Sequence, residues 1–387
     1  MSEKRKICAV ITARPSYSRI KTVLRGLEKD NETELQLVVS GSALLDRYGK
    51  VIEVLKQDGF EPHAEVYMVV EGGSVVTSAK STGMAIIELS TIFTSLKPDM
   101  VLTVADRYET LATAIAASYL NIPLAHIQGG EVTGSIDEKV RHAVTKLADI
   151  HCVSNESAAA RVRKMGEVAE KIFVTGCPSI DLAKSVSVDR KQFDLAGTRV
   201  PAGVGADVNL ADPYLMVMQH PVTNDWKQAE RQVLETLKAI DELNTPTLWF
   251  WPNIDAGSDS ISRAIRRARE NSQLSVTRFI KNVPPEEFLA LLQKAECLIG
   301  NSSVGIREGS FLGTPVVNIG DRQAGRDRAD NVLDVDYCKD DILDAINSQR
   351  AHGRYAVSTL YGDGGAGLRI VDALKTTDLT ARKILQY

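Results

Sequence analysis

The sequence predicts an α/β protein with two doubly wound domains. Continuous apolar runs, such as 7–12 and 100–105, alternate with amphipathic stretches, and such runs are typical of strands buried on both faces of a parallel sheet. At 387 residues the chain is too long for one typical core. Periodicity is lost over 185–212, where glycine and proline accumulate, so we predict domains over 1–182 and 183–369.

The composition argues against several classes of partner. The chain has 44% hydrophobic residues, 25% charged residues and a formal net charge of −4, so it lacks the basic excess that nucleic-acid binding requires. No apolar run approaches the roughly 20 residues of a membrane span. The five cysteines are odd in number and widely spaced, which favours buried thiols over disulfides or metal ligands. We therefore expect a cytoplasmic protein with no metal, membrane or nucleic-acid partner.

Two arginines follow the first strand of the predicted N-terminal domain. Arg14 and Arg19 lie where the strand 7–12 turns into a helix, and open α/β sheets bind ligands at this carboxyl edge. Arginine at that position favours an anion, and the alternative is a pair of solvated side chains. Further strands are expected at 34–41, 100–105, 124–127, 150–154 and 172–176, with a long helix that ends near Leu96.

Acidic residues follow two later strands of this domain. Asp106 comes directly after the run 100–105, and it is either a site residue or only the N-cap of the next helix. The segment 128–142 has three glycines and contains Glu131, Asp137, Glu138, Arg141 and His142. We interpret it as the acid/base candidate. The alternative is a flexible turn followed by helical pairs at i,i+4 spacing, Asp137 with Arg141 and Glu138 with His142.

The predicted C-terminal domain repeats the pattern. Strands are expected at 214–219, 247–251, 275–280, 298–300 and 314–320, with helices at 226–243 and 284–295 and a last helical stretch at 368–383. His220, Asn253 and Ser302 each follow the carboxyl end of a strand, so we expect all three at one sheet edge, where they can meet one ligand. A structural role is the alternative for His220.

The segment Leu298–Glu308 carries the most informative motif. A buried strand that ends in a Gly/Asn/Ser/Ser turn before a new helix directs unpaired N–H groups and the positive end of the helix dipole at one point, which suits a phosphate. Ser302 and Ser303 can add hydroxyl donors, and Glu308 can accept from a pair of ribose hydroxyls. The alternative is an ordinary N-cap and a surface glutamate. We interpret the segment as a site for a nucleoside diphosphate.

Short motifs span nearly the whole chain. They are Arg14–Ser18, Ala105–Leu111, His126–Glu131, Arg141–Lys146, Gln219–Thr223, Pro252–Ser258, Gly300–Ser303, Gly313–Gly320, Arg322–Gln323 and Tyr361–Gly364. Together, and in this order, they resemble the UDP-N-acetylglucosamine 2-epimerase family, specifically its hydrolysing branch of nonulosonic acid biosynthesis.

The resemblance implies a fold and a reaction. The fold is two Rossmann-like doubly wound domains facing across a cleft, as in the GT-B class of glycosyltransferases, with a C-terminal helix over 370–387 that joins the first domain. The reaction is anti-elimination of UDP to a 2-acetamidoglycal, followed by hydration to a free sugar with inverted C2. The substrate is UDP-N-acetylglucosamine or UDP-N,N′-diacetylbacillosamine, in sialic or legionaminic acid biosynthesis. The family implies no cofactor and suggests a homo-oligomer.

The resemblance also implies residue roles. The catalytic set is Asp106, Glu131, Asp137, His220 and Gln128, and the UDP site is Arg14, Arg19, His220, Asn253, Ser302, Ser303, Glu308 and Arg322. Gln128 departs from the family pattern, because many members have a glutamate there and an amide cannot usefully exchange a proton. Either this branch works with Asp106, Glu131 and Asp137 alone, which we favour, or Gln128 is a substitution that blocks turnover.

Three other functions compete with this interpretation. A non-hydrolysing epimerase returns UDP to the glycal, a glycosyltransferase uses the same nucleotide site with an acceptor, and a silent module only binds the nucleotide sugar. The segments 129–131 and 253–257 favour the hydrolysing branch, and the cluster of carboxylates argues against a glycosyltransferase. Gln128 keeps the silent module open.

Overall fold

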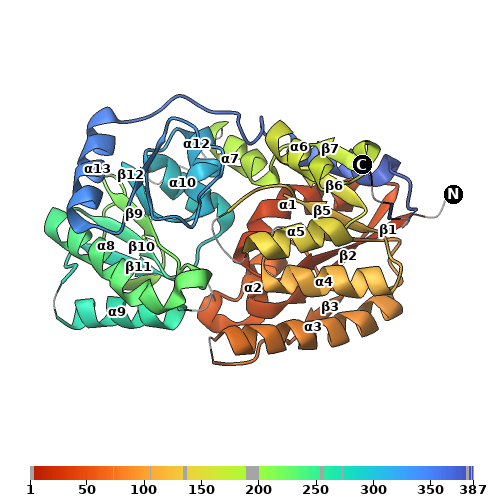
Figure 1. Ribbon diagram of the computed structural model, residues 1–387. Helices are drawn as coiled ribbons and strands as arrows, with labels where there is room; N and C mark the ends of the chain where they lie inside the picture. The colour runs from red at the N-terminus through yellow and green to blue at the C-terminus, as the bar shows by residue number, and fades with distance from the viewer. Residues whose placement is uncertain are drawn as a thin grey trace. The chain divides into compact units, whose positions relative to one another are not determined.

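The computed structural model describes residues 4–72, 74–104, 106–133, 137–188, 200–252, 257–271, 273–380, 383–384 and 386. The chain forms two compact units, each built on its own sheet (Figure 1). Unit 1 comprises Met1–Glu131, Ile136–Asp181 and Tyr361–Tyr387, and unit 2 comprises Val132–Ser135 and Leu182–Leu360. Both are Rossmann-like, which confirms the predicted fold class.

Unit 1 contains a seven-stranded parallel sheet in the order β3-β2-β1-β4-β5-β6-β7. Its strands are β1 Arg5–Ile11, β2 Thr33–Ser40, β3 Ala64–Val66, β4 Met100–Val104, β5 Leu124–Ile127, β6 Ile150–Val153 and β7 Ile172–Val174. Its α-helices are α1 Arg14–Lys29, α2 Val51–Gln57, α3 Val75–Leu96, α4 Tyr108–Tyr119, α5 Asp137–Leu147, α6 Glu156–Lys164 and α14 Ala366–Thr376, and α7 Pro178–Val188 leads into unit 2. Single 3₁₀ turns lie at Gly41–Leu44, Asp46–Tyr48 and Ala169–Lys171.

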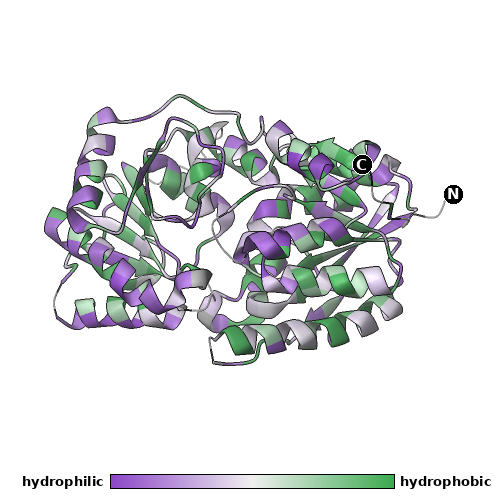
Figure 2. Cartoon of the chain, viewed as in Figure 1, coloured by the Kyte–Doolittle hydropathy of each residue, from purple (hydrophilic) through white to green (hydrophobic). Residues whose placement is uncertain are grey.

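Both faces of this sheet are buried, as the continuous apolar runs predict. Ile7, Ala9 and Ile11 of β1 pack with α1, α2 and α14 on one face. Cys8 and Val10 of the same strand pack with α3 and α4 on the other. Figure 2 shows the hydrophobic colour concentrated along the strands of each unit. Because successive side chains of a strand point to opposite faces, each strand contributes to two separate cores.

Unit 2 contains a second seven-stranded sheet in the order β14-β13-β12-β9-β10-β11-β8. Its strands are β8 Gly203–Gly205, β9 Leu215–Met218, β10 Thr247–Phe250, β11 Thr277–Ile280, β12 Cys297–Gly300, β13 Val316–Ile319 and β14 Val332–Val335. Its helices are α8 Ala229–Leu243, α9 Ser258–Glu270, α10 Pro285–Lys294, α11 Ser303–Ile306, α12 Glu308–Leu312 and α13 Lys339–His352, with a 3₁₀ segment at Thr223–Gln228. Leu215 and Val217 of β9 pack with α8, α9 and α13.

The C-terminal helix differs from the prediction of 370–387. Helix α14 begins at Ala366, because the carboxylate of Asp181 accepts from the N–H groups of Ala366 and Gly367 at 2.8 and 2.6 Å. It ends at Thr376, and Thr377 is extended with φ −67° and ψ 144°. Arg5 and Lys171 donate to the following backbone carbonyls, so tertiary hydrogen bonds replace the helical ones.

A second difference lies within 185–212, which the sequence predicts to be a connection. Part of it is strand β8, which pairs antiparallel with β11 at the edge of the sheet. A Cβ on Gly203 or Gly205 would lie 2.2 or 2.3 Å from a carbonyl oxygen of β11. Glycine is required by this close approach but has low strand propensity, so the pattern did not indicate a strand.

The state of the cysteines and the apolar character of the helices bear on the expectations from composition. All five cysteines are free thiols, and four of them are buried. Within the described ranges, no helix has the length and apolar character needed to cross a membrane.

A buried carboxylate fastens the C-terminal tail to unit 1. Glu167 accepts from Lys146 of α5 at 2.6 Å, from His151 of β6 at 3.1 Å, and from Lys383. Burial by itself raises the pKa of Glu167, but these three hydrogen bonds outweigh it and lower the pKa from 4.5 to about 2. The tail is therefore tied to the C-terminal end of α5.

We expect Glu167→Gln to lower the free energy of unfolding at pH 7 by about 3 kcal/mol, which is the value of a pKa difference of this size. Because the folded-state pKa lies below the unfolded one, the unfolded state binds more protons between them. The contribution is present above about pH 4.5 and is lost as the pH falls towards about 2.

Chemical denaturation of wild type and variant from pH 7 to pH 2.5 measures this difference. Glu170→Gln, at an exposed position three residues away, is the matched control. A difference between wild type and Glu167→Gln that stays constant down to pH 2.5 would contradict the assignment.

Candidate functional site

The topology of each sheet places one switch point beside the predicted site residues. In unit 2 the chain leaves β9 towards β10 and leaves β12 towards β13, so the direction reverses between the adjacent strands β9 and β12. In unit 1 it reverses between β1 and β4. Crevices that bind ligands open at the carboxyl ends of such strands. His220 and Ser302 follow β9 and β12, and Arg14 and Asp106 follow β1 and β4.

Asn301 joins the ends of β9 and β12. Its side chain accepts from the backbone N–H of His220 at 2.8 Å and donates to the backbone carbonyl of the same residue at 2.8 Å. The strands approach closely here, since Gly300 has φ +130° and a Cβ on it would lie 2.2 Å from the carbonyl oxygen of Met218. His220 is 3% exposed. Its position is therefore fixed by an amide that mimics a strand partner.

Arg322 and Gln323 complete this corner. Both side chains donate to the backbone carbonyl of Asn301, at 3.2 and 2.9 Å. The structure thus brings the predicted residues His220, Ser302 and Arg322 together around Asn301. The sequence motif contains Asn301, but the N-cap interpretation assigned it no role.

The helix expected after Ser302 is broken. Ser302 is the N-cap of α11, and its hydroxyl accepts from the N–H of Val304 at 3.4 Å. Helix α11 ends at Ile306, Arg307 stands in the break with φ −94° and ψ −75°, and α12 starts at Glu308. The N-cap alternative is therefore correct as local structure, and it leaves a ligand role open.

Glu308 has the environment of a ligand-binding carboxylate. It is 7% exposed, and its Oε2 atom has no hydrogen-bond partner among the residues that the structure describes. It forms an ion pair with Arg307, whose Nε lies 3.9 Å from Oε2. A buried polar atom without a partner costs about 1–3 kcal/mol, so the free energy favours a ligand that donates to it. Asn253, the predicted contact of a base, lies outside the described residues.

Arginines flank the switch point of unit 1. Arg14 is the first residue of α1, and Ser16 shapes the turn by accepting from the N–H groups of Thr12 and Ala13 at 3.0 and 2.9 Å. Burial lowers the pKa of the Arg14 guanidinium to about 10, so it stays positively charged near neutral pH. Arg19 lies further along α1 and is half-buried.

Arg141 joins two of the predicted acidic segments. It is 1% exposed, and it donates to the carboxylate of Asp106 and to the backbone carbonyl of Glu131, the latter at 2.9 Å. Burial alone disfavours the cation, but Asp106, Glu131 and Asp137 raise the pKa of Arg141 above its ordinary value. Asp106 is not the N-cap of α4, because Arg107 occupies that position.

The remaining candidates surround this pair. Ser154 donates to Oε1 of Glu131 at 2.8 Å, and Asp137 begins α5 one turn before Arg141. Glu138 pairs with His142 at 3.2 Å, as the helical-pair alternative predicts. Gln128 is 2% exposed with φ +68°, and its amide donates to the sulfur of Cys177 at 2.9 Å. The hydrogen bond to Cys177 thus positions the amide of Gln128.

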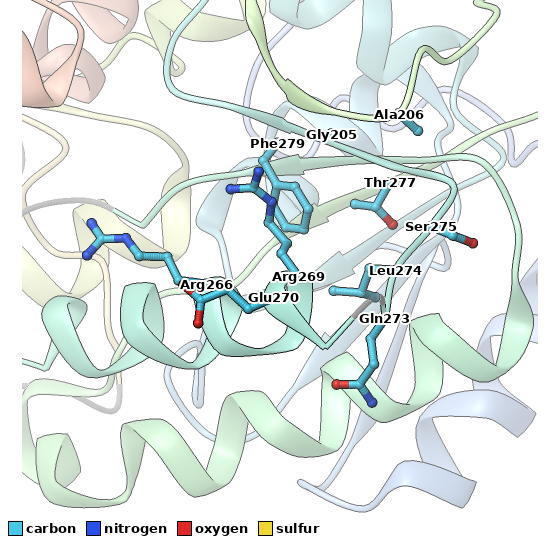
Figure 3. Close-up of a pocket in the computed structure, with 10 residues that line it drawn as sticks. All are labelled: Gly205, Ala206, Arg266, Arg269, Glu270, Gln273, Leu274, Ser275, Thr277 and Phe279. Atoms are coloured by element: carbon cyan, nitrogen blue, oxygen red, sulfur yellow. The ribbon is translucent and has the colours of Figure 1, made fainter.

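The surface pocket and the possible metal ligands among the described residues give no further candidate site. The surface pocket of Figure 3, about 740 Å³, is lined by Arg266, Arg269 and Phe279 and includes the amino end of β11 at Thr277, opposite the edge that carries His220. It contains none of the predicted site residues. Across the part of the chain that the structure describes, no group of three or more His, Cys, Asp or Glu side chains is arranged to hold a metal ion.

Comparison with known proteins supplies a family. The sequence profile of the UDP-N-acetylglucosamine 2-epimerase family matches residues 25–375. A UDP-N,N′-diacetylbacillosamine 2-epimerase (hydrolyzing) from Legionella pneumophila is 32% identical over 375 residues, 97% of each chain. A GDP/UDP-N,N′-diacetylbacillosamine 2-epimerase (hydrolyzing) from Campylobacter jejuni is 30% identical over 86% of this chain and 84% of that one. The crystal structure of UDP-GlcNAc 2-epimerase from Neisseria meningitidis bound to UDP-GlcNAc has a TM-score of 0.75 at 18% identity and covers 96% of this chain and 100% of that chain.

Arg141→Met removes the side chain that joins Asp106 to the Glu131 segment. We expect the free energy of unfolding to fall by about 3–5 kcal/mol, because the variant leaves a carboxylate without its cation. Adding Asp106→Asn to Arg141→Met should recover part of this loss. Denaturant titration measures both effects.

Arg163→Met is the matched control, since Arg163 forms a solvent-exposed pair with Glu156 at 3.9 Å in the same unit. Its effect should stay within about 0.5 kcal/mol. An Arg141→Met protein as stable as this control would show that the ion pair does not hold the two segments.

Proposed function

The chain belongs to the UDP-N-acetylglucosamine 2-epimerase family, and we propose that it is a hydrolysing 2-epimerase that acts on UDP-N,N′-diacetylbacillosamine. The Legionella and Campylobacter relatives carry this activity in their names. The structural observation that supports it most is the buried Arg141, which holds Asp106 beside the Glu131 segment. Carboxylates held in place are what proton transfer at C2 requires, since C2 is too weak a carbon acid to ionise unaided.

Unit 2 supplies most of the proposed UDP site. We assign the ribose to Glu308, because its buried Oε2 atom needs a donor. We assign the diphosphate to residues that gather around Asn301 or carry positive charge, and the uracil to the segment with Asn253. Within unit 2 the proposed diphosphate ligands are His220, Ser302, Ser303 and Arg322, and in unit 1 we propose Arg14 and Arg19 as anion-binding residues.

The proposed reaction has two steps. In the first, a carboxylate among Asp106, Glu131 and Asp137 takes the C2 proton, the electron pair forms the C1–C2 double bond, and the C1–O bond breaks to release UDP. Cationic and hydroxyl groups stabilise the departing diphosphate. In the second, water adds its hydroxyl to C1, and C2 receives a proton on the opposite face. The product is the free 2-acetamido sugar with inverted C2, which suits legionaminic acid biosynthesis.

Gln128 fits this scheme as a hydrogen-bonding group. Its amide neither gives nor takes a proton near neutral pH, and its N–H already binds Cys177. The three carboxylates therefore carry the proposed acid/base chemistry without a glutamate at position 128. No cofactor enters the proposed reaction.

The mechanism predicts isotope incorporation. In deuterated water the released sugar should carry deuterium at C2, because elimination removes the original hydrogen and hydration replaces it from solvent. NMR of the products from UDP-N,N′-diacetylbacillosamine and from UDP-N-acetylglucosamine measures this and identifies the preferred substrate. Sugar released without C2 deuterium would refute elimination. An epimer released still attached to UDP would instead identify the non-hydrolysing reaction.

Variants of the carboxylates are the controls for this experiment. Asp106→Asn and Glu131→Gln should each lower turnover at least roughly 100-fold with UDP affinity retained, the usual cost of losing a general acid or base. Gln128→Glu should change the rate only modestly. A silent parent that gains activity on Gln128→Glu would show that position 128 must carry a carboxylate.

We also propose that the protein is cytoplasmic and assembles with copies of itself. Five free thiols suit a reducing compartment. Val76 and Ile87 of helix α3 and Tyr119 at the end of α4 are 60%, 68% and 86% exposed. Exposed apolar patches mark protein contacts.

Sedimentation should therefore find an oligomer for the wild type and a smaller species for Ile87→Lys. Leu368→Lys, at a position 76% exposed on α14, is the matched control and should leave the oligomer unchanged. A monomeric wild type would contradict the proposed assembly.

A further inference from the structure

Arg307 is a buried cation that the proposed reaction does not use. It is 2% exposed and stands in the break between α11 and α12. Its backbone is held there, since its carbonyl accepts from the hydroxyl of Ser310 at 2.7 Å and from the N–H of Phe311 at 3.3 Å. Burial of a guanidinium is costly unless its hydrogen bonds and charge are matched, so its partners need an explanation.

Two of its contacts are residues of the proposed UDP site. Nη2 of Arg307 donates to Oγ of Ser303 at 2.8 Å. Nε of Arg307 lies 3.9 Å from Oε2 of Glu308, at ion-pair distance but beyond a hydrogen bond. One planar group thus faces both the proposed diphosphate ligand and the proposed ribose ligand.

The contact with Ser303 sets the direction of its hydroxyl. A guanidinium has donors but no acceptor, so the O–H of Ser303 cannot point at Arg307 and must point elsewhere. A hydroxyl that accepts from a cation is also a stronger donor, because hydrogen bonds in a chain polarise one another. Both effects suit a hydroxyl that donates to a phosphate oxygen.

The contact with Glu308 has a different effect. Nε of Arg307 places positive charge 3.9 Å from Oε2, and among the described residues Oε2 accepts no hydrogen bond. A carboxylate oxygen that no described donor reaches suits a pair of ribose hydroxyls, which can donate to it. Arg307 therefore supplies charge at Glu308 without competing for the ligand.

We propose that Arg307 is a positioning residue that presents Ser303 to the diphosphate and Glu308 to the ribose of the same nucleotide. This inference rests on the proposed UDP site. It makes the preference for a diphosphate and the preference for a ribose depend on one side chain.

The test compares three ligands, UDP, 2′-deoxy-UDP and uridine, by calorimetry. The ribose preference is the ratio of Kd for 2′-deoxy-UDP to Kd for UDP, and the phosphate preference is the ratio of Kd for uridine to Kd for UDP. A loss of folded protein affects all three ligands alike and leaves both ratios unchanged. Glu308→Gln should lower only the ribose preference, and Ser303→Ala should lower only the phosphate preference.

Arg307→Met should lower both preferences, each by roughly fivefold or more, as expected when hydrogen bonds involving charged groups are weakened. Arg307→Lys keeps a positive charge but loses the planar fork, and it should lower both preferences by a smaller factor. Arg350→Met is the matched control, because it removes a guanidinium that pairs with Glu296 at 2.9 Å, next to the amino end of β12. It should leave both preferences unchanged.

The outcomes separate this inference from the proposed function. A wild type that does not bind UDP refutes the proposed UDP site itself. A wild type that binds UDP, with both preferences retained in Arg307→Met and Arg307→Lys, refutes only the role of Arg307. A fall in one preference alone overturns the shared role, since Arg307 would then serve a single group.

Discussion

The carboxyl edge of unit 2 depends on the two hydrogen bonds between the Asn301 amide and the backbone of His220. Strands β9 and β12 are parallel neighbours whose strand register ends at Met218 and Gly300. The amide continues the pairing by one residue, and Gly300 permits the approach because it carries no Cβ. His220, Ser302 and Arg322 take their positions from this junction. A small polar side chain thus defines the geometry of a region that otherwise consists of turns.

Each of the two units contains a buried arginine that contacts two neighbouring groups. Arg141 in unit 1 and Arg307 in unit 2 are almost fully buried, and each faces two groups that belong to different chain segments or different helices. A guanidinium is suited to this role because its donors form a rigid planar fork and its charge is permanent. Each arginine therefore contacts groups of the proposed sites.

The sequence was sufficient to predict the parts of the structure that depend on local pattern. Strands such as β1 and β4 are continuous apolar runs, and residues within three positions of their ends, such as Arg14 and Asp106, lie at the sheet edge by topology alone. Strand β8 was not predicted, because its glycines are required by the close approach to β11. A local sequence pattern does not indicate such a tertiary contact.

The end of α14 and the role of Arg307 were missed for a related reason. The helix stops where Arg5 and Lys171, from distant positions, donate to the carbonyls of Thr377 and Asp378 that follow it. Arg307 gains its neighbours from a break in a helix that the pattern predicts to be continuous. The spacing of Ser303 and Arg307, four residues apart, was the one local signal that these two side chains could meet.

The discontinuous course of unit 1 constrains the order in which the protein is built. Its core includes Ile370, Val371 and Leu374 of α14, and its tail reaches α5 through Lys383. Nearly all of unit 2 lies between the two parts. During synthesis, unit 2 can bury its core while unit 1 still lacks a helix. The core that β1 and α1 begin is therefore completed only after α14 has been made.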